Sequence, residues 1–284
     1  MRTMTAWAIL LTMASTAATA EPAMWVVRGP VGEVTLFGTV HELPPGTEWL
    51  SPRIAARIDA ADSIVIETIL PTEPAALGAL VATAGTARGV KPLAERLGPE
   101  RVKKLAQVAQ RLGVPIAALA GSKTWFVALL MAGIAATRDG LSPTDGVEPL
   151  LTARAAAKHK PLIGLERPAE QFGFFDALPE ADQQALLDTT LDEMPTAAAD
   201  ARALIASWAA GHPEAIDTDK ELHATPRLEK LLLTDRNARW AAWIAGVVAH
   251  PGKVFVAVGA AHLTGLHSVQ SMLAARGFVV ERIE

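Results

Sequence analysis

Two histidines occur in the same short motif, once near each end of the chain. Gly38-Thr39-Val40-His41 follows an apolar run at residues 34–37, and Gly259-Ala260-Ala261-His262 follows another at residues 254–258. An imidazole nitrogen can bind a transition-metal ion, and it can also give or take a proton near neutral pH. The two histidines could therefore form one metal site or one acid–base site, provided that the fold brings them together.

Two glutamates have a similar position after apolar segments. Glu67 follows residues 63–66, and Glu166 follows residues 161–165. A carboxylate at the end of a buried strand is costly unless it is paired or binds a metal. Two neutral imidazoles with one or two carboxylates are a known ligand set for zinc, manganese or iron.

The pattern predicts a divalent metal ion, with manganese, cobalt, zinc and iron as candidates. His41, Glu67 and His262 are the expected ligands, and Glu166 is the expected general base or fourth ligand. Arg236 is the third expected catalytic residue, because a guanidinium can bind a carboxylate or a developing oxyanion. Thr234 and Asp235 predict a helix N-terminus that places Arg236 in the first turn.

Each of these residues also has a purely structural interpretation. A buried histidine is often only a hydrogen-bonded core residue, and Glu166 could form a salt bridge with Arg167 beside it. Arg236 could be an ordinary exposed helix residue. The functional interpretation depends on all four strand ends meeting at one edge of one sheet, where open α/β sheets bind ligands.

The elements that would position these residues follow from the hydrophobic pattern. We expect strands at residues 25–27, 34–37, 63–66, 161–165, 253–258 and 278–283, and helices at 51–61, 100–112, 125–136, 147–158 and 266–275. Residues 167–249 should be mainly helical, with breaks at Pro179, Pro195, 211–213 and 225–226. The prediction is an α/β fold whose mixed or mainly parallel sheet is split between the N- and C-terminal parts, with a large central helical insertion.

At these motifs the sequence resembles the TraB/GumN family, which includes Tiki proteases and pheromone-shutdown proteins. The resemblance lies in the two G-x-x-H motifs, in Glu67 and Glu166 between them, and in Arg236-Asn237 before the final helix. It covers residues 25–284 and implies an erythromycin-esterase/ChaN-like α/β fold. For Tiki-like members it also implies a metal-dependent peptidase that uses the histidines and glutamate.

The first twenty residues predict a secretory signal peptide. Arg2 precedes an apolar run at residues 6–13, and Ala18-Thr19-Ala20 is a small-residue cleavage signal before Glu21. The run is shorter than the roughly 20 residues of a membrane span. We therefore expect residues 21–284 to be one exported domain, periplasmic or secreted, without a membrane span.

Composition excludes several classes of protein and of site. The net charge is −4 without a basic tail, which argues against a nucleic-acid partner, and the absence of cysteine excludes disulfides and lipidation. The chain lacks the motifs of serine hydrolases, zincins, P-loop NTPases and Rossmann dehydrogenases.

The sequence thus predicts an exported metal-dependent hydrolase that acts on a peptide or another small substrate. Two alternatives stay open. One is a non-catalytic protein that sequesters a peptide, haem or a sugar in the same pocket, and the other is an accessory protein of polysaccharide export.

Overall fold

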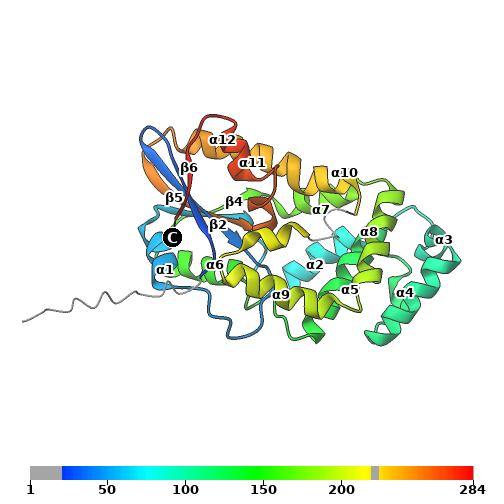
Figure 1. Cartoon of the computed structure of the whole chain (residues 1–284). Helices are drawn as coiled ribbons and strands as arrows, with labels where there is room; N and C mark the ends of the chain where they lie inside the picture. Colours follow the sequence, from blue (N-terminus) through cyan, green and yellow to red (C-terminus); the bar gives the residue numbers. More distant parts are fainter. Residues whose placement is uncertain (1–20, 219–223, 284) are drawn as a thin grey trace, which may run out of the picture.

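A computed structural model describes residues 21–218 and 224–283, and the predicted signal peptide lies outside these residues. In the described part of the chain, six strands form one sheet in the order β4-β3-β5-β2-β1-β6. The sheet lies at one end of the molecule and a block of helices at the other (Figure 1). The strands are β1 (Met24–Arg28), β2 (Gly32–Thr39), β3 (Ser63–Thr68), β4 (Leu162–Glu166), β5 (Gly252–Gly259) and β6 (Val280–Ile283).

Strand directions confirm the predicted mixed sheet. The four strands β2, β5, β3 and β4 are parallel, while β1 pairs antiparallel with both β2 and β6. Since β5 lies between β2 and β3, the C-terminal part of the chain completes a sheet begun by the N-terminal part. The two strands that precede the G-x-x-H histidines are therefore neighbours.

Helices cover the sheet and build the central insertion. Those near the sheet include α1 (Pro52–Ala60), α6 (Val147–Ala157), α11 (Asp235–Val247) and α12 (Val269–Ala274). The other α-helices are α2 (Pro74–Gly85), α3 (Leu93–Leu97), α4 (Pro99–Arg111), α5 (Thr124–Arg138), α7 (Pro168–Asp176), α8 (Glu180–Glu193), α9 (Ala197–Ala209) and α10 (Pro226–Glu229). Shorter helical turns are η1 (Ile116–Leu119), η2 (Pro213–Thr218), η3 (Lys230–Thr234) and η4 (Ala260–Leu263).

Local sequence signals explain where several helices begin and end. Ser51 accepts a hydrogen bond from the backbone N–H of Ile54, 3.2 Å away, and Pro52 occupies the first position of α1. The predicted breaks at Pro179, Pro195, 211–213 and 225–226 all separate helices. α12 is shorter than predicted, because residues 266–268 still belong to the turn before Val269.

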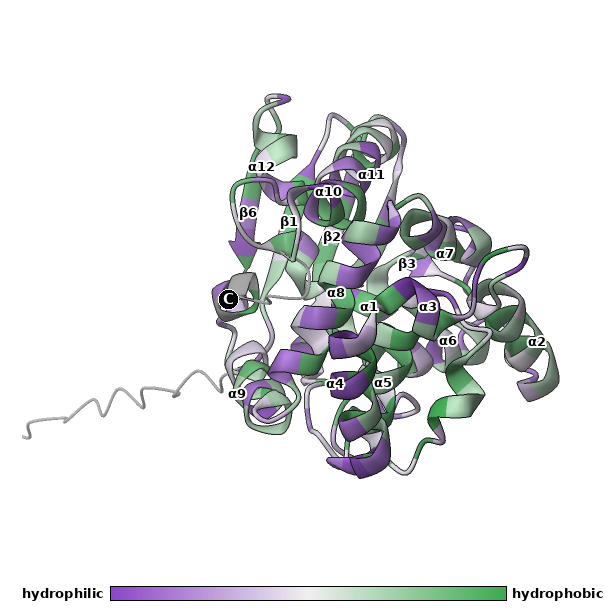
Figure 2. Cartoon of the chain, turned by 90° about the vertical axis from the view of Figure 1, so that its right-hand side faces the viewer, coloured by the Kyte–Doolittle hydropathy of each residue, from purple (hydrophilic) through white to green (hydrophobic). Residues whose placement is uncertain are grey.

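Besides a cluster that joins α11 and α12 to the sheet, two further hydrophobic clusters build the core. One contains the inner face of the sheet around Phe37 and Phe255 and reaches α9 through Trp208. The other belongs to the helical block and centres on α5, which Figure 2 shows as largely hydrophobic. α5 packs mainly against α8, so the insertion has a core of its own.

The sequence prediction was wrong about the environment of β4. We expected a buried strand, but β4 is one of the two edge strands of the sheet and Ile163 is 40 % exposed. An apolar run of five residues does not distinguish an edge strand from a central one. No helix among the described residues is both long enough and apolar enough to cross a membrane.

Candidate functional site

The four predicted site residues at strand ends lie at one edge of the sheet. Thr39 of β2 is in register with Gly259 of β5, so the two G-x-x-H motifs leave the sheet side by side. Glu67 lies near the end of β3, which pairs with both β5 and β4. This edge borders a cavity of about 360 Å³ that is lined by His41, Glu67, Arg236 and His262 among others.

Gly259 is the point on which the two histidines and Glu67 converge. A Cβ atom at this position would lie 3.0 Å from Glu67 Oε1, and 3.6 Å from both His41 Nε2 and His262 Cδ2. The backbone N–H of Gly259 donates a 2.6 Å hydrogen bond to Glu67 Oε1. A Cβ atom here would crowd the Glu67 carboxylate, while its contacts with the two histidines would be ordinary van der Waals contacts.

The hydrogen bonds of His262 define its tautomer. The Asn237 amide nitrogen donates to the carbonyl of His267 at 2.8 Å, so its oxygen faces His262 Nδ1 at 2.6 Å and accepts from it. His262 Nε2 lies 3.0 Å from Arg236 Nη1, which can only donate. Burial lowers the pKa of His262 to about 3, with Arg236 adding to the effect. His262 is thus a neutral imidazole whose Nε2 lone pair faces the site.

His41 is held in the opposite charge state. Its Nδ1 lies 2.8 Å from Glu148 Oε1, which also accepts a 2.5 Å hydrogen bond from the Thr39 hydroxyl. The negative charge of Glu148 is the largest cause that raises the pKa of His41, to about 9. Gly146, just before Glu148, has no room for a side chain, because a Cβ would lie 2.0 Å from the His41 carbonyl. His41 Nε2 remains directed toward Gly259.

The two histidines are expected to titrate in different pH ranges. A proton NMR titration should give His41 a midpoint between 6.5 and about 9, below the upper value because its side chain is 64 % exposed and water screens Glu148. His262 should stay neutral above pH 5. In Glu148→Gln the His41 midpoint should fall toward 6.5, and an unchanged midpoint would show that the pair does not form.

Arg236 lies at the centre of a buried ionic cluster. Its Nη2 donates to Glu67 Oε2 at 2.6 Å and to Glu166 Oε2 at 2.8 Å, while Nη1 donates to the Leu232 carbonyl. Burial opposes ionisation of Glu67, but the attraction of Arg236 and of a protonated His41, together with the hydrogen bond from the Gly259 N–H, lowers its pKa well below the usual range. The cluster therefore contains a true ion pair in a region almost closed to water.

Glu166 lies behind Arg236 and not on the cavity wall. Both of its carboxylate oxygens accept hydrogen bonds from Arg236 Nε, and Oε1 also accepts from Arg239 at 3.1 Å. Glu166 is 7 % exposed and does not line the cavity. A general base or metal ligand needs a free carboxylate oxygen at the cavity, so the position favours a role in holding Arg236.

Arg236 reaches the site from a continuous helical segment. The predicted N-terminus at Thr234 was wrong, since Thr234 has helical backbone angles and α10, η3 and α11 follow one another without a break. η3 is one wide π-helical turn, a feature often found at functional sites. It places Leu232 and Leu233 on the cavity wall, one turn before Arg236.

Four further polar residues belong to the site, and the residue pattern alone assigned none of them a role. Asn237 orients His262, Glu148 and Thr39 orient His41, and Gln171 of α7 donates to Glu67 Oε2 at 3.1 Å. Asn237 was visible only as part of the Arg-Asn motif. The TraB/GumN resemblance noted Glu148 only as an acid after Gly146-Val147 and gave it no role, and this residue approaches His41 from a helix 107 positions further along the chain.

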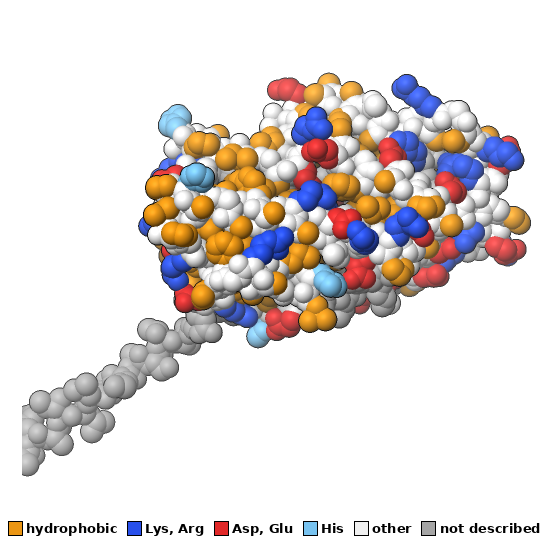
Figure 3. All heavy atoms as spheres, turned by 90° about the horizontal axis from the view of Figure 1, so that it is seen from above, with side chains coloured by type: hydrophobic (Ala, Val, Ile, Leu, Met, Phe, Trp, Pro, Cys, Tyr) orange, Lys and Arg blue, Asp and Glu red, His pale blue; other side chains and the backbone are white. Residues whose placement is uncertain are grey.

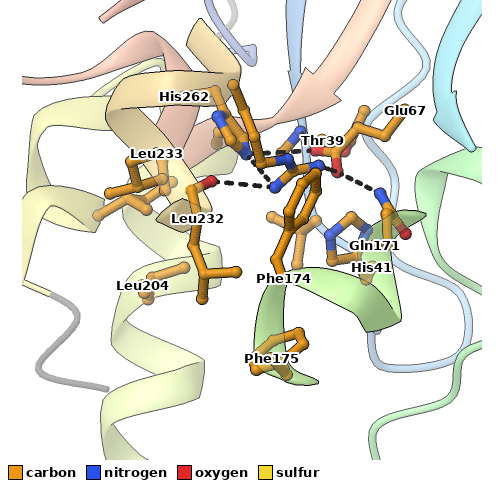
Figure 4. Close-up of a pocket in the computed structure, with 16 residues that line it drawn as sticks. Thr39, His41, Glu67, Gln171, Phe174, Phe175, Leu204, Leu232, Leu233 and His262 are labelled. Carbon is orange, nitrogen blue, oxygen red and sulfur yellow. Dashed lines mark hydrogen bonds and ion pairs between the residues drawn. The ribbon is translucent and has the colours of Figure 1, made fainter. Parts of the chain in front are cut away.

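The wall opposite the polar groups is apolar. Figure 4 shows Thr39, Glu67 and His262 on one side, with Phe175, Leu204 and Leu232 on the other. The Phe174 ring contacts the guanidiniums of both Arg236 and Arg239, whose central carbons are 5.6 and 5.3 Å from its centroid. The cavity thus lies between the sheet edge and the helical insertion.

The outer surface carries charges of both signs. On the face shown in Figure 3, lysine and arginine side chains are interspersed with aspartate and glutamate. Such a face lacks the continuous positive stripe that a nucleic-acid backbone requires.

Together, fold and site define an α/β protein with two histidines and a buried arginine–glutamate cluster at the parallel strand ends. The chain matches the TraB/PrgY/gumN family over residues 23–282 and belongs to that family. It is 26 % identical over 238 residues to the uncharacterized protein YbaP of Escherichia coli (strain K12), covering 84 % of this chain and 86 % of that one. YbaP of Shigella flexneri matches to the same extent. No solved structure matches the chain.

Proposed function

We propose that the protein is an exported metal-dependent hydrolase with a peptidase-like activity. The observation that carries the proposal is the convergence of His41, Glu67 and His262 on Gly259 in the wall of a cavity. Export rests on the predicted signal peptide, and the substrate class rests on the Tiki-like resemblance.

The chemistry of the donor groups fits a divalent ion. Each imidazole has its Nδ1 hydrogen-bonded to a side-chain oxygen, of Glu148 or of Asn237, and its Nε2 directed into the site. Metal-binding histidines are usually oriented in this way by a partner behind the ring. His41, His262 and Glu67 would hold the ion, which when bound would supply Lewis-acid chemistry.

Arg236 sets a condition for metal binding. The guanidinium occupies the lone pair of His262 Nε2 and one oxygen of Glu67. Among the residues that the structure describes, no three acidic or histidine side chains already form a metal-binding group. An ion bound by both histidines therefore requires Arg236 to give up its contact with His262.

The remaining chemistry belongs to the side chains of the site. In the metal-free protein His41 is an imidazolium held by Glu148, and binding of an ion at Nε2 would release the Nε2 proton. Arg236 is desolvated and oriented by Glu166, and release of His262 on metal binding would free one of its N–H groups to donate to a substrate oxygen on which negative charge develops. Glu166 is a positioning residue in this scheme.

Metal content of the purified protein tests the proposal. After loading with manganese, cobalt, zinc or iron, mass spectrometry should find about one ion per chain, and the double variant His41→Ala/His262→Ala should retain none. The matched control replaces two exposed histidines outside the site, His212→Ala/His250→Ala, and should bind as the wild type does. Equal metal in both variants, or none in the wild type, would exclude the metal site.

A binding protein without catalysis is the second candidate. The observation that favours it is that Arg236 already supplies a positive charge to Glu67 and Glu166, so the cluster is complete without an ion. In that case the wild type should bind ligands with the metal absent. Ligand binding that is unaffected by a chelator, together with no cleavage, would support this second function.

A further inference from the structure

The geometry points to a substrate with an uncharged, apolar side chain next to the reacting bond, held between α7, α9 and η3. This inference rests on the proposed function for the reaction and names the substrate class of the same cavity. Leu204 of α9, Phe175 of α7 and Leu232 of η3 are the residues expected to determine specificity.

The first argument is the division of the cavity into two walls. Strand ends and η4 supply the reactive groups on one wall, while three separate helical elements supply leucine and phenylalanine on the other. A substrate whose bond lies against His41 and Glu67 must direct its neighbouring group toward Leu204 and Leu232. Burial of apolar surface there stabilises the complex by about 25 cal/mol per Å².

The second argument is the balance of charge. Glu67 and Glu166 are neutralised by Arg236, Glu166 also pairs with Arg239, and His41 is paired with Glu148. Every charged side chain among the described residues that line the cavity thus already has a partner of opposite charge. A lysine or glutamate side chain of a substrate would lose its water without gaining a counter-charge, which is strongly unfavourable.

The third argument is size. At about 360 Å³, the cavity is at the lower end of the range of roughly 300–1,000 Å³ for small-molecule pockets. It can take one side chain or a short acyl group and not a whole oligomer. The specificity should therefore concern one position of a longer substrate.

Cleavage profiling of the metal-loaded full chain tests the inference. Cut sites in a mixture of denatured proteins are mapped by mass spectrometry, and one position beside the cut should favour Leu, Phe and Met over Lys and Glu by roughly 100-fold. Leu204→Glu should shift that preference toward Lys and Arg, and Leu204→Arg toward Asp and Glu. The matched controls Ala203→Glu and Ala203→Arg change the adjacent exposed residue of α9 and should keep the apolar preference.

A binding measurement separates this inference from the proposed function. Saturation-transfer NMR compares N-acetyl-leucinamide with N-acetyl-lysinamide and with the α-amide of N-acetyl-glutamate, which keeps its side-chain carboxylate. Each probe is measured with and without metal. If the leucine probe binds preferentially, loses that binding in Leu204→Glu, and no protein is cleaved, the proposed hydrolase activity is wrong and the apolar pocket is supported. Cleavage without side-chain preference would overturn the apolar pocket and leave the hydrolase standing. Equal or absent binding of all three probes in a protein that does not cleave would also overturn the pocket.

Discussion

Replacing Arg236 by methionine is expected to lower the free energy of unfolding by about 3–5 kcal/mol. Arg236 donates to Glu67 and Glu166, and both carboxylates are only 7 % exposed. Methionine fills similar space but leaves Glu67 without its cation and Glu166 with only the half-exposed Arg239. Urea unfolding of the two proteins at pH 7 measures the difference.

Arg239→Met is the matched control, because Arg239 is on the same helix and donates to the same Glu166. Its side chain is 51 % exposed, so its loss should cost at most about 1 kcal/mol. Equal destabilisation by both substitutions would show that the deeper burial of Arg236 does not make its ion pairs contribute more to stability than those of Arg239.

The penalty for losing Arg236 should depend on pH. The pKa of Glu67 is lowered in the folded protein, so its ion pair stabilises the fold above the ordinary value of 4.5 and is lost as pH falls below it. In the variant, protonation at low pH removes the buried negative charge that destabilises the folded state. The difference in unfolding free energy between wild type and Arg236→Met should therefore narrow in acid.

Substitution of Glu67 by glutamine should reduce turnover by at least about 100-fold. Glutamine has the same shape and keeps one oxygen for the N–H of Gly259, but it removes the negative charge between the two histidines and Arg236. Turnover of a peptide that the wild type cleaves, with metal content of the same samples, separates lost chemistry from lost metal.

The control for Glu67→Gln is Glu170→Gln, which changes an exposed glutamate of α7 that interacts with Arg167. Its turnover should match that of the wild type. If Glu67→Gln also retains full turnover, Glu67 has only a structural role and the proposed site is wrong.

Local sequence alone predicted the six strands and most of the helices, because hydrophobic periodicity and capping residues act within a few positions, but it did not predict α2 and α3. The run at residues 254–258 and the glycine after it indicated a strand and a tight exit, and Ser51-Pro52 indicated the start of α1. The repeated G-x-x-H motif also located His41 and His262, since parallel strands end at the same edge of a sheet.

Tertiary structure decided what each group at that edge contacts. Glu67 and Glu166 look equivalent in the sequence, yet only Glu67 lines the cavity. The reason is the strand order: β3 lies beside the central strand β5, whereas β4 is the outermost strand on that side of the sheet. Glu148 and Asn237 acquire their roles through long-range contacts with the two histidines. The contrast between a charged His41 and a neutral His262 likewise depends on burial and on the charges nearby, which are properties of the assembled fold and not of the residues beside each histidine in the chain.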